Sequence, residues 1–297
     1  MQKAKPITVF VLILFIFSAC YQDITLDLQE PDIRPAVFGI ARAGKPVDVI
    51  VNKSYPLLTF TDTLDQSIQT EISLFVNNKF KEQLNYQNKH YYSNYIPQVN
   101  DLLKIKFEWN GKEISAEEKV PAQIKIDSVQ YLNRTSEGLN FYVHFKDNYS
   151  EKNYYAISAK YTYRDDSSKL HTSFIYSPTS KSPLIGNEED LSDYFDSQSL
   201  LFTDTLFNGK NIALQINFGN LYLSSDETLI SVKLFLESID KDYYLYVKSF
   251  LKNQRAQNPD LFLGDAEYIN VHSNINNGYG IFKVFTMDSK DITEYFR

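Results

Sequence analysis

The sequence predicts a mainly β protein with two antiparallel β-sandwich domains in tandem, of immunoglobulin-like or fibronectin-like kind. The 22 tyrosines and 21 phenylalanines far outnumber the single tryptophan and two methionines, and such a composition favours half-buried pleated surfaces. Short runs of alternating apolar and polar residues recur between turn residues, whereas helical periodicity is found in one segment. Up to residue 121, the order of these features indicates strands without intervening helices.

The chain begins with a pattern typical of an export signal. Lys3 and Lys5 precede an apolar run over residues 7–17, which is too short to span a bilayer comfortably. Small residues at 18 and 19 then lead to Cys20, the single cysteine of the chain. We therefore assign residues 1–19 as a lipoprotein signal peptide and expect lipid attachment at the Cys20 thiol. A plain secretory signal with an incidental or buried cysteine is the alternative.

Residues 20–30 form an acidic segment, which we interpret as a lipidated tether. Tyr21 stands where Asp would favour retention at the inner membrane in many diderm bacteria, so the outer membrane is the expected location. The early acidic residues suit either a solvated tether or a signal that sends the protein to the cell exterior. The formal net charge of −7 becomes −9 without Lys3 and Lys5, which argues against nucleic acid and other polyanions as partners.

Residues 31–121 are predicted to form the first sandwich. Turn residues divide this part into strands, and Asn77-Asn78 and Asn110-Gly111 suit tight hairpin turns because Asn and Gly tolerate positive φ. The expected strands are 36–40, 47–51, 72–76, 79–84, 102–109 and 112–120.

Pro121 marks the predicted boundary, because proline cannot donate into a β-ladder. Residues 122–297 then form the second sandwich, with a polar insertion over 165–199. Its expected strands are 124–131, 139–145, 154–163, 212–218, 229–237 and 279–285. A helix is predicted near 240–257, capped by Ser238 or Asp240, because apolar residues recur there at i, i+3, i+4, i+7 and i+8.

The closing stretch carries a family resemblance. Residues 273–282 read S-N-I-N-N-G-Y-G-I-F, after a helix with a Tyr-Tyr pair at 243–244, and the mature N-terminus reads Cys-Tyr-Gln-Asp-Ile-Thr-Leu. These features, with the strand over 114–116 that runs into Val120-Pro121, resemble the Bacteroidota lipoprotein family called domain of unknown function 4249. The resemblance covers almost the whole mature chain. It implies a surface-exposed outer-membrane lipoprotein, often paired with a TonB-dependent transporter.

Within that signature, Asn274, Asn277, Gly278 and Gly280 suit a backbone that needs positive φ or a close approach. Two interpretations stay open for these four residues. They form either a tight turn that feeds the last strand or a direct contact with a partner.

Motifs of known reaction chemistry do not occur in the sequence. The four histidines are scattered without metal-ligand spacing, and neither a G-x-S-x-G elbow nor a phosphate-binding glycine loop is found. The acidic residues 188–190 suit a solvated loop better than a calcium site. Asp-Ser/Thr triplets at 62–64, 127–129 and 204–206 match a short O-glycosylation pattern, which chance also supplies. We therefore expect no catalytic residues, no metal and no cofactor.

Two function classes follow from these observations. The first is a non-enzymatic accessory partner of an outer-membrane β-barrel protein, either a TonB-dependent transporter or an assembly complex. The second is a stand-alone surface lipoprotein that binds glycans or peptides, since abundant tyrosines can stack on sugars and hydrogen-bond them.

Overall fold

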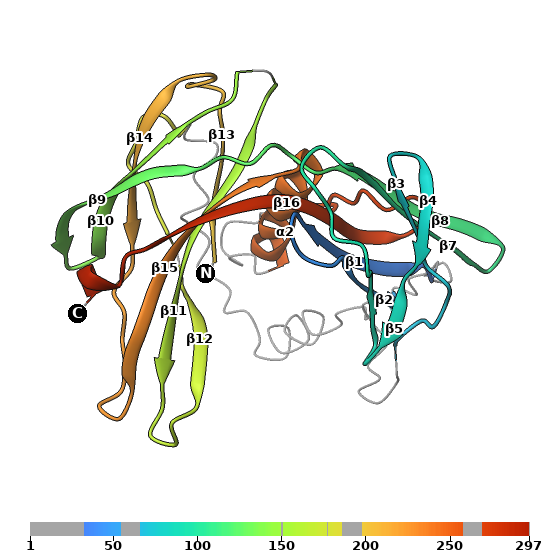
Figure 1. Ribbon diagram of the computed structural model, residues 1–297, viewed down its shortest axis with the longest axis horizontal. Coiled ribbons are helices and arrows are strands. Elements are labelled where there is room, and N and C mark those ends of the chain that lie inside the picture. The colour runs from blue at the N-terminus through green and yellow to red at the C-terminus, as the bar shows by residue number, and fades with distance from the viewer. Residues whose placement is uncertain are drawn as a thin grey trace, which may run out of the picture. The chain divides into compact units, whose positions relative to one another are not determined.

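The computed structural model describes residues 33–54, 66–149, 151–176, 178–185, 198–257 and 269–296. Within them the chain is mainly β, as predicted, and its strands form three sheets (Figure 1). Cys20, the tether over residues 20–30 and the acidic residues 188–190 lie outside the described residues.

The largest sheet has nine strands. In spatial order they are β12 (Leu170–Ile175), β11 (Tyr154–Arg164), β15 (Thr228–Ile239), β16 (Tyr279–Asp291), β1 (Pro35–Arg42), β2 (Asp48–Lys53), β6 (His90–Tyr92) and β5 (Asn85–Gln87), with β13 (Leu200–Thr203) paired to β11. The second sheet contains β4 (Lys79–Gln83), β3 (Ser73–Val76), β7 (Leu102–Trp109) and β8 (Lys112–Lys119). The third contains β14 (Asn211–Phe218), β10 (Gly138–Lys146) and β9 (Ile126–Thr135).

Strands β1 and β16 pair in parallel, from Ala36 opposite Tyr279 to Arg42 opposite Phe285. The other ladders between described strands are antiparallel. This pair departs from the antiparallel arrangement predicted from the sequence. A parallel pair needs a long crossover, and here the crossover is most of the chain, which no local pattern specifies. The pair joins the two ends of the described chain in one sheet (Figure 1).

The two hairpins predicted from turn residues are confirmed. Asn77 and Asn78 have φ values of 52° and 65° between β3 and β4, and Asn110 and Gly111 have values of 50° and 71° between β7 and β8. Both residues of each turn have positive φ, which matches the twist of the strands they join.

Two large hydrophobic cores lie within the described chain. One is formed by residues between Ile124 and Ile292, and the other by residues between Val37 and Val120 together with Ile275, Phe282 and Val284. The predicted boundary at Pro121 falls between the two sets. The core of the N-terminal part is nevertheless completed by side chains from the C-terminal part, because β16 lies beside β1.

The predicted helix is confirmed as α2 (Lys241–Gln257). Asp240 is its N-cap, since Asp240 Oδ1 accepts a hydrogen bond of 2.6 Å from the Tyr243 amide. The buried side chains of Tyr244 and Leu251 pack with Phe285 of β16 and Ala156 of β11. A short 3₁₀ helix, η1 (Thr293–Phe296), ends the described chain.

Candidate functional site

Asn274 connects three parts of the structure through its side chain. Its Oδ1 accepts a hydrogen bond from the Phe282 amide at 2.9 Å, and its Nδ2 donates to the Phe282 carbonyl at 3.0 Å. The same Nδ2 lies 2.8 Å from Glu118 Oε1 on β8. The side chain therefore holds the start of β16 and also binds a carboxyl group of the second sheet.

The other three signature residues also contact the protein's own strands. Asn277 has a φ of 58°, and its Nδ2 donates to the carbonyl of Glu113 at 2.9 Å. A Cβ at Gly278 would lie 2.8 Å from the carbonyl oxygen of Pro35, and one at Gly280, where φ is 107°, would overlap the carbonyl of Val37. The close approach to β1 leaves no room for a side chain at Gly278 or Gly280, and the positive φ of Asn277 is one that Asn tolerates. Contact of the signature with a partner stays a prediction.

An apolar surface that sequence reasoning missed lies on β1 and the start of β16. Phe38 is 43% exposed, Ile40 is 51% exposed and Tyr279 is 44% exposed. Phe38 pairs with Ile281 and Ile40 with Lys283, so these side chains point to one side of the sheet, opposite to the buried Val37 and Phe282. We call Phe38, Ile40 and Tyr279 the β1 face. Burial alternates along β1, but the sequence Pro-Ala-Val-Phe-Gly-Ile-Ala-Arg has no polar residue at the exposed positions, so it does not mark a solvent side.

Helix α2 covers the continuation of this side of the sheet along β16. The Lys283 ammonium lies 4.1 Å from the centroid of the Tyr243 ring and 4.2 Å from that of Phe285. From Tyr243 a row of aromatic rings follows the helix through Tyr246 to Phe250, with centroids 6.5 and 6.0 Å apart. Phe250 is exposed at the end of this row.

A cluster of carboxyl groups lies where β8, the start of α2 and the segment before β16 meet. Glu118 accepts the hydrogen bond from Asn274, and burial, followed by the Asp240 charge, raises the pKa of Glu118 to about 8. Burial also raises the pKa of Asp240 to about 6, although the amides of Tyr243 and Val284 donate to its carboxylate. His272 Nε2 lies 2.6 Å from Asp242 Oδ1.

A groove of about 630 Å³ opens on the second sheet. Its polar side chains bond one another, since Lys106 pairs with Glu113 at 2.6 Å and Gln83 Nε2 donates to Ser73 Oγ at 3.1 Å. The residues that line it are Thr70, Glu71, Ser73, Gln83, Lys106, Phe107, Glu108, Gly111 and Glu113. A ligand here would have to replace these internal hydrogen bonds.

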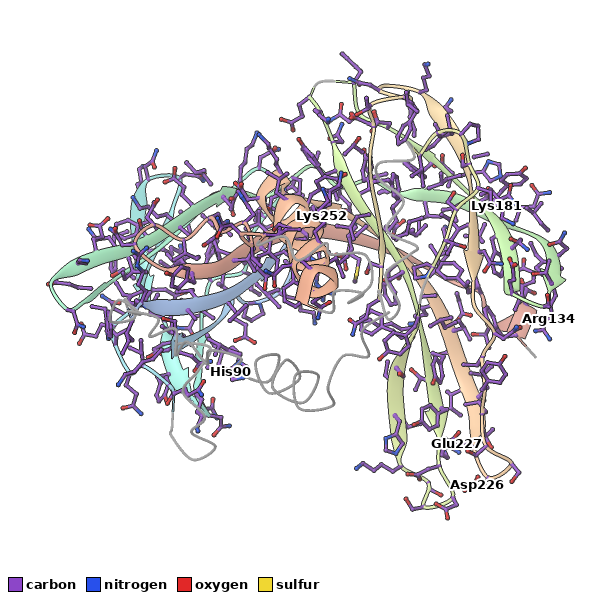
Figure 2. All side chains as sticks on the ribbon, turned by 180° about the vertical axis from the view of Figure 1, so that it is seen from behind. His90, Arg134, Lys181, Asp226, Glu227 and Lys252 are labelled. Atoms are coloured by element: carbon purple, nitrogen blue, oxygen red, sulfur yellow. The ribbon has the colours of Figure 1, made fainter. Side chains whose placement is uncertain are left out.

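The charged side chains labelled in Figure 2 lie on separate parts of the structure: His90 on β6, Lys252 on α2, Arg134 on β9, and Asp226 and Glu227 together at the loop before β15. No group of three or more His, Cys, Asp or Glu side chains among the described residues is arranged to hold a metal ion. In these same residues, no helix combines the length and apolar character needed to cross a bilayer.

Comparison with known proteins gives a family but no activity. No curated protein matches the chain. Among solved structures, the chitinase ChiA74 from Bacillus thuringiensis has 12% sequence identity and a TM-score of 0.18, with 68% of this chain and 30% of that chain covered. The family description "Domain of unknown function (DUF4249)" matches residues 22–291, nearly the whole chain after Cys20. The chain therefore belongs to the DUF4249 family.

Proposed function

We propose that this protein is a non-enzymatic lipoprotein of the outer membrane that acts as accessory partner of an outer-membrane β-barrel. Cys20 carries the lipid, the body faces the cell exterior, and the partner is a TonB-dependent transporter or an assembly complex. In this proposal the two hydrophobic cores belong to two immunoglobulin-like sandwiches in tandem. The observation that carries the proposal is the β1 face.

The position of the β1 face in the sheet supports docking. Strands β1 and β16 are central in a nine-stranded sheet, and a solvent-facing side of such strands is normally polar. Here Phe38, Ile40 and Tyr279 are exposed together, and clustered apolar side chains of this kind mark interaction surfaces. Large aromatic and aliphatic side chains are also the usual anchors of protein interfaces.

The connection to the expected lipid supports a partner in the membrane. The twelve residues from Tyr21 to Asp32 precede Ile33, and a chain of this length reaches at most roughly 40 Å when fully extended. That length limits the distance between the lipid and Ile33, two residues before β1 begins at Pro35.

The test is capture of the partner by the tagged full chain from detergent-solubilised outer membranes. We expect a large barrel protein in near-equal amount with the wild type, and at least tenfold less with the double variant Phe38→Ser, Ile40→Ser. The matched control is Leu206→Ser with Tyr222→Ser, since these side chains are 51% and 83% exposed elsewhere. Recovery of the lipoprotein alone, or equal capture by both double variants, would refute the proposal.

The lipid is tested separately. The variant Cys20→Ser is expected to leave the membrane fraction, and the wild-type thiol is expected to carry acyl chains by mass spectrometry. Labelling of intact cells with a membrane-impermeant reagent tests the outward orientation. An unmodified Cys20 would remove the anchoring half of the proposal, whatever the capture experiment gives.

The second candidate function is binding of a glycan or peptide without a partner. The groove on the second sheet favours it, because hydroxyl, amide and charged side chains surround a space of about 630 Å³. Such side chains can hydrogen-bond the hydroxyl groups of a saccharide in place of water. A glycan array probed with the purified chain tests this function. Binding that is lost in Gln83→Ala but kept in the double variant of the β1 face would favour it over the barrel partner.

A further inference from the structure

The tether over residues 20–30 contains an alternation of apolar and polar side chains. Ile24, Leu26 and Leu28 occupy every second position, and Thr25 and Asp27 separate them. In an extended chain, residues with this spacing project to the same side. The tether can therefore present an apolar side, which a segment that only spans water does not need.

A turn motif stands between this segment and β1. Glu30-Pro31-Asp32-Ile33 has proline and aspartate at the two central positions of a reverse turn, where the fixed φ of Pro31 favours the reversal. Because β1 begins at Pro35, a reversal there directs the preceding residues back along β1. Counted outwards from the turn, positions 28, 26 and 24 come opposite positions 35, 37 and 39.

The β1 face lies at this level of the chain. Phe38 and Ile40 belong to β1, and both edges of β1 are paired, one with β2 and the other with β16. A returning segment therefore cannot add a strand beside β1. The side of the sheet opposite to the β1 face is filled by the core that contains Val37 and Phe282. The face that remains for the segment is the β1 face.

Charges at the two ends of β1 complement those of the tether. The guanidinium carbon of Arg34 lies 5.4 Å from the centroid of the Tyr279 ring, and Arg42 ends β1 in the same alternation as the β1 face. Asp23 and Glu30 flank the apolar residues of the tether. An antiparallel return brings Glu30 toward Arg34 and Asp23 toward the Arg42 end, so opposite charges meet at both ends.

We propose that residues 24–28 of the tether cover the β1 face until a partner displaces them. This inference rests on the proposed function, because it concerns the surface that is assigned there to the barrel. Three apolar side chains of the tether pack on the three side chains of the β1 face. A weak contact suffices, since a short linker gives an effective concentration on the order of millimolar. The larger interface of a partner protein then replaces this contact.

The test is hydroxyl-radical footprinting of the purified full chain in lipid nanodiscs, without a barrel protein. The variant in which Ile24, Leu26 and Leu28 are all replaced by Ser loses the apolar side of the tether. Labelling of Phe38 and Tyr279 is then expected to rise about threefold or more above the wild type, because the cover is held only by these intramolecular contacts.

A second triple variant is the matched control. Thr25→Ser, Asp27→Asn and Gln29→Ser change the same segment at the alternate positions, so labelling should stay at the wild-type level. Tyr222, which is 83% exposed, is the internal reference in each sample. Equal labelling of the β1 face in the wild type and the first variant, or an equal rise in both variants, overturns the proposal.

Partner capture separates this proposal from the proposed function. The footprint needs no partner, so a protected β1 face in a chain that captures no barrel would support the cover and refute the barrel partner. Where a barrel is captured, the first triple variant should capture at least as much of it as the wild type. Weaker capture by that variant, with normal capture by the control, would show that the tether helps docking and would overturn the competition.

Discussion

The side chain of Asn274 pairs with Phe282 as a neighbouring strand would. It accepts from the Phe282 amide and donates to the Phe282 carbonyl, at 2.9 and 3.0 Å. Phe282 is fully buried in the core that also contains Val37. A side-chain amide therefore completes the hydrogen bonding of a buried backbone position, where an unpaired group would be costly.

We predict that Asn274→Ala destabilises the protein by about 1–3 kcal/mol, because it leaves the polar backbone groups of Phe282 unsatisfied. Urea unfolding of the purified chain measures the loss. Asn276→Ala is the matched control, since Asn276 is exposed and its side chain has only a 3.4 Å contact with Ser115. Equal effects of the two substitutions would show that the Phe282 pairing contributes little.

Gly280 gives a second prediction, about the parallel pair of β1 and β16. Alanine there must adopt a φ of 107° and would overlap the Val37 carbonyl, so β16 would have to move away from β1. We expect a loss above about 3 kcal/mol, which exceeds the usual cost of positive φ alone.

Gly111→Ala separates these two causes. Gly111 also has positive φ, at 71°, but a Cβ there would meet no atom within 4 Å. Its loss should be about 1–2 kcal/mol, the cost of the backbone conformation alone. Thermal unfolding of both variants checks the difference, and a Gly280→Ala variant as stable as Gly111→Ala would contradict the close approach.

Local features of the fold could be predicted from the sequence. The turns at Asn77-Asn78 and Asn110-Gly111, and helix α2 with its cap at Asp240, follow from residue types within a few positions of each other. Each is decided by backbone preference and by side-chain hydrogen bonds within one turn.

Long-range relationships could not be predicted in the same way. The pairing of Ala36 with Tyr279 joins residues at opposite ends of the described chain, and alternation along a strand does not name the partner strand. Glu118 and Asp242 were unremarkable in the sequence for the same reason, because their shared environment exists only once β8 and α2 meet. The four signature residues can be singled out from the sequence by residue type, but the contacts of this segment with Pro35, Val37 and Phe282 required the structure.

A third prediction concerns global stability against pH. The folded-state pKa of Glu118 is about 8, above its ordinary value of 4.5, so the folded protein binds the extra proton between these values. The stabilisation is complete below about pH 4.5 and is lost as pH rises to about 8. Asp240, with a pKa of about 6 against 3.8, adds a loss between those two values.

At about 1.4 kcal/mol per pKa unit, the free energy of unfolding should fall by at most about 5 kcal/mol from Glu118 and at most about 3 kcal/mol from Asp240. Asp165 acts in the opposite direction but outside this window, because hydrogen bonds from Ser167 and His171 lower its pKa to about 2. Urea unfolding between pH 5 and 8.5 measures the profile, and Glu118→Gln should flatten it. A wild-type profile that rises through this range would contradict the assignment of the proton.

The last prediction concerns the buried ion pair between Lys283 and Glu237. The pair is 2.7 Å long and its side chains are only 12% and 18% exposed. Burial alone would lower the pKa of Lys283, but Glu237, together with Tyr243 and Asp240, outweighs it and the pKa is raised. Lys283→Met leaves the charge of Glu237 buried without a counter-ion, and we expect a loss of about 3–5 kcal/mol.

Adding Glu237→Met to Lys283→Met should recover much of that loss, because the double variant buries no unpaired charge. Lys106 and Glu113 provide the comparison, since their pair is 2.6 Å long but 43% and 50% exposed. A double-mutant cycle there should give a coupling below about 1 kcal/mol. Similar couplings for the two pairs would mean that burial beneath α2 does not strengthen the Lys283 pair, and that packing of the rings of Tyr243 and Phe285 explains the effect of Lys283→Met.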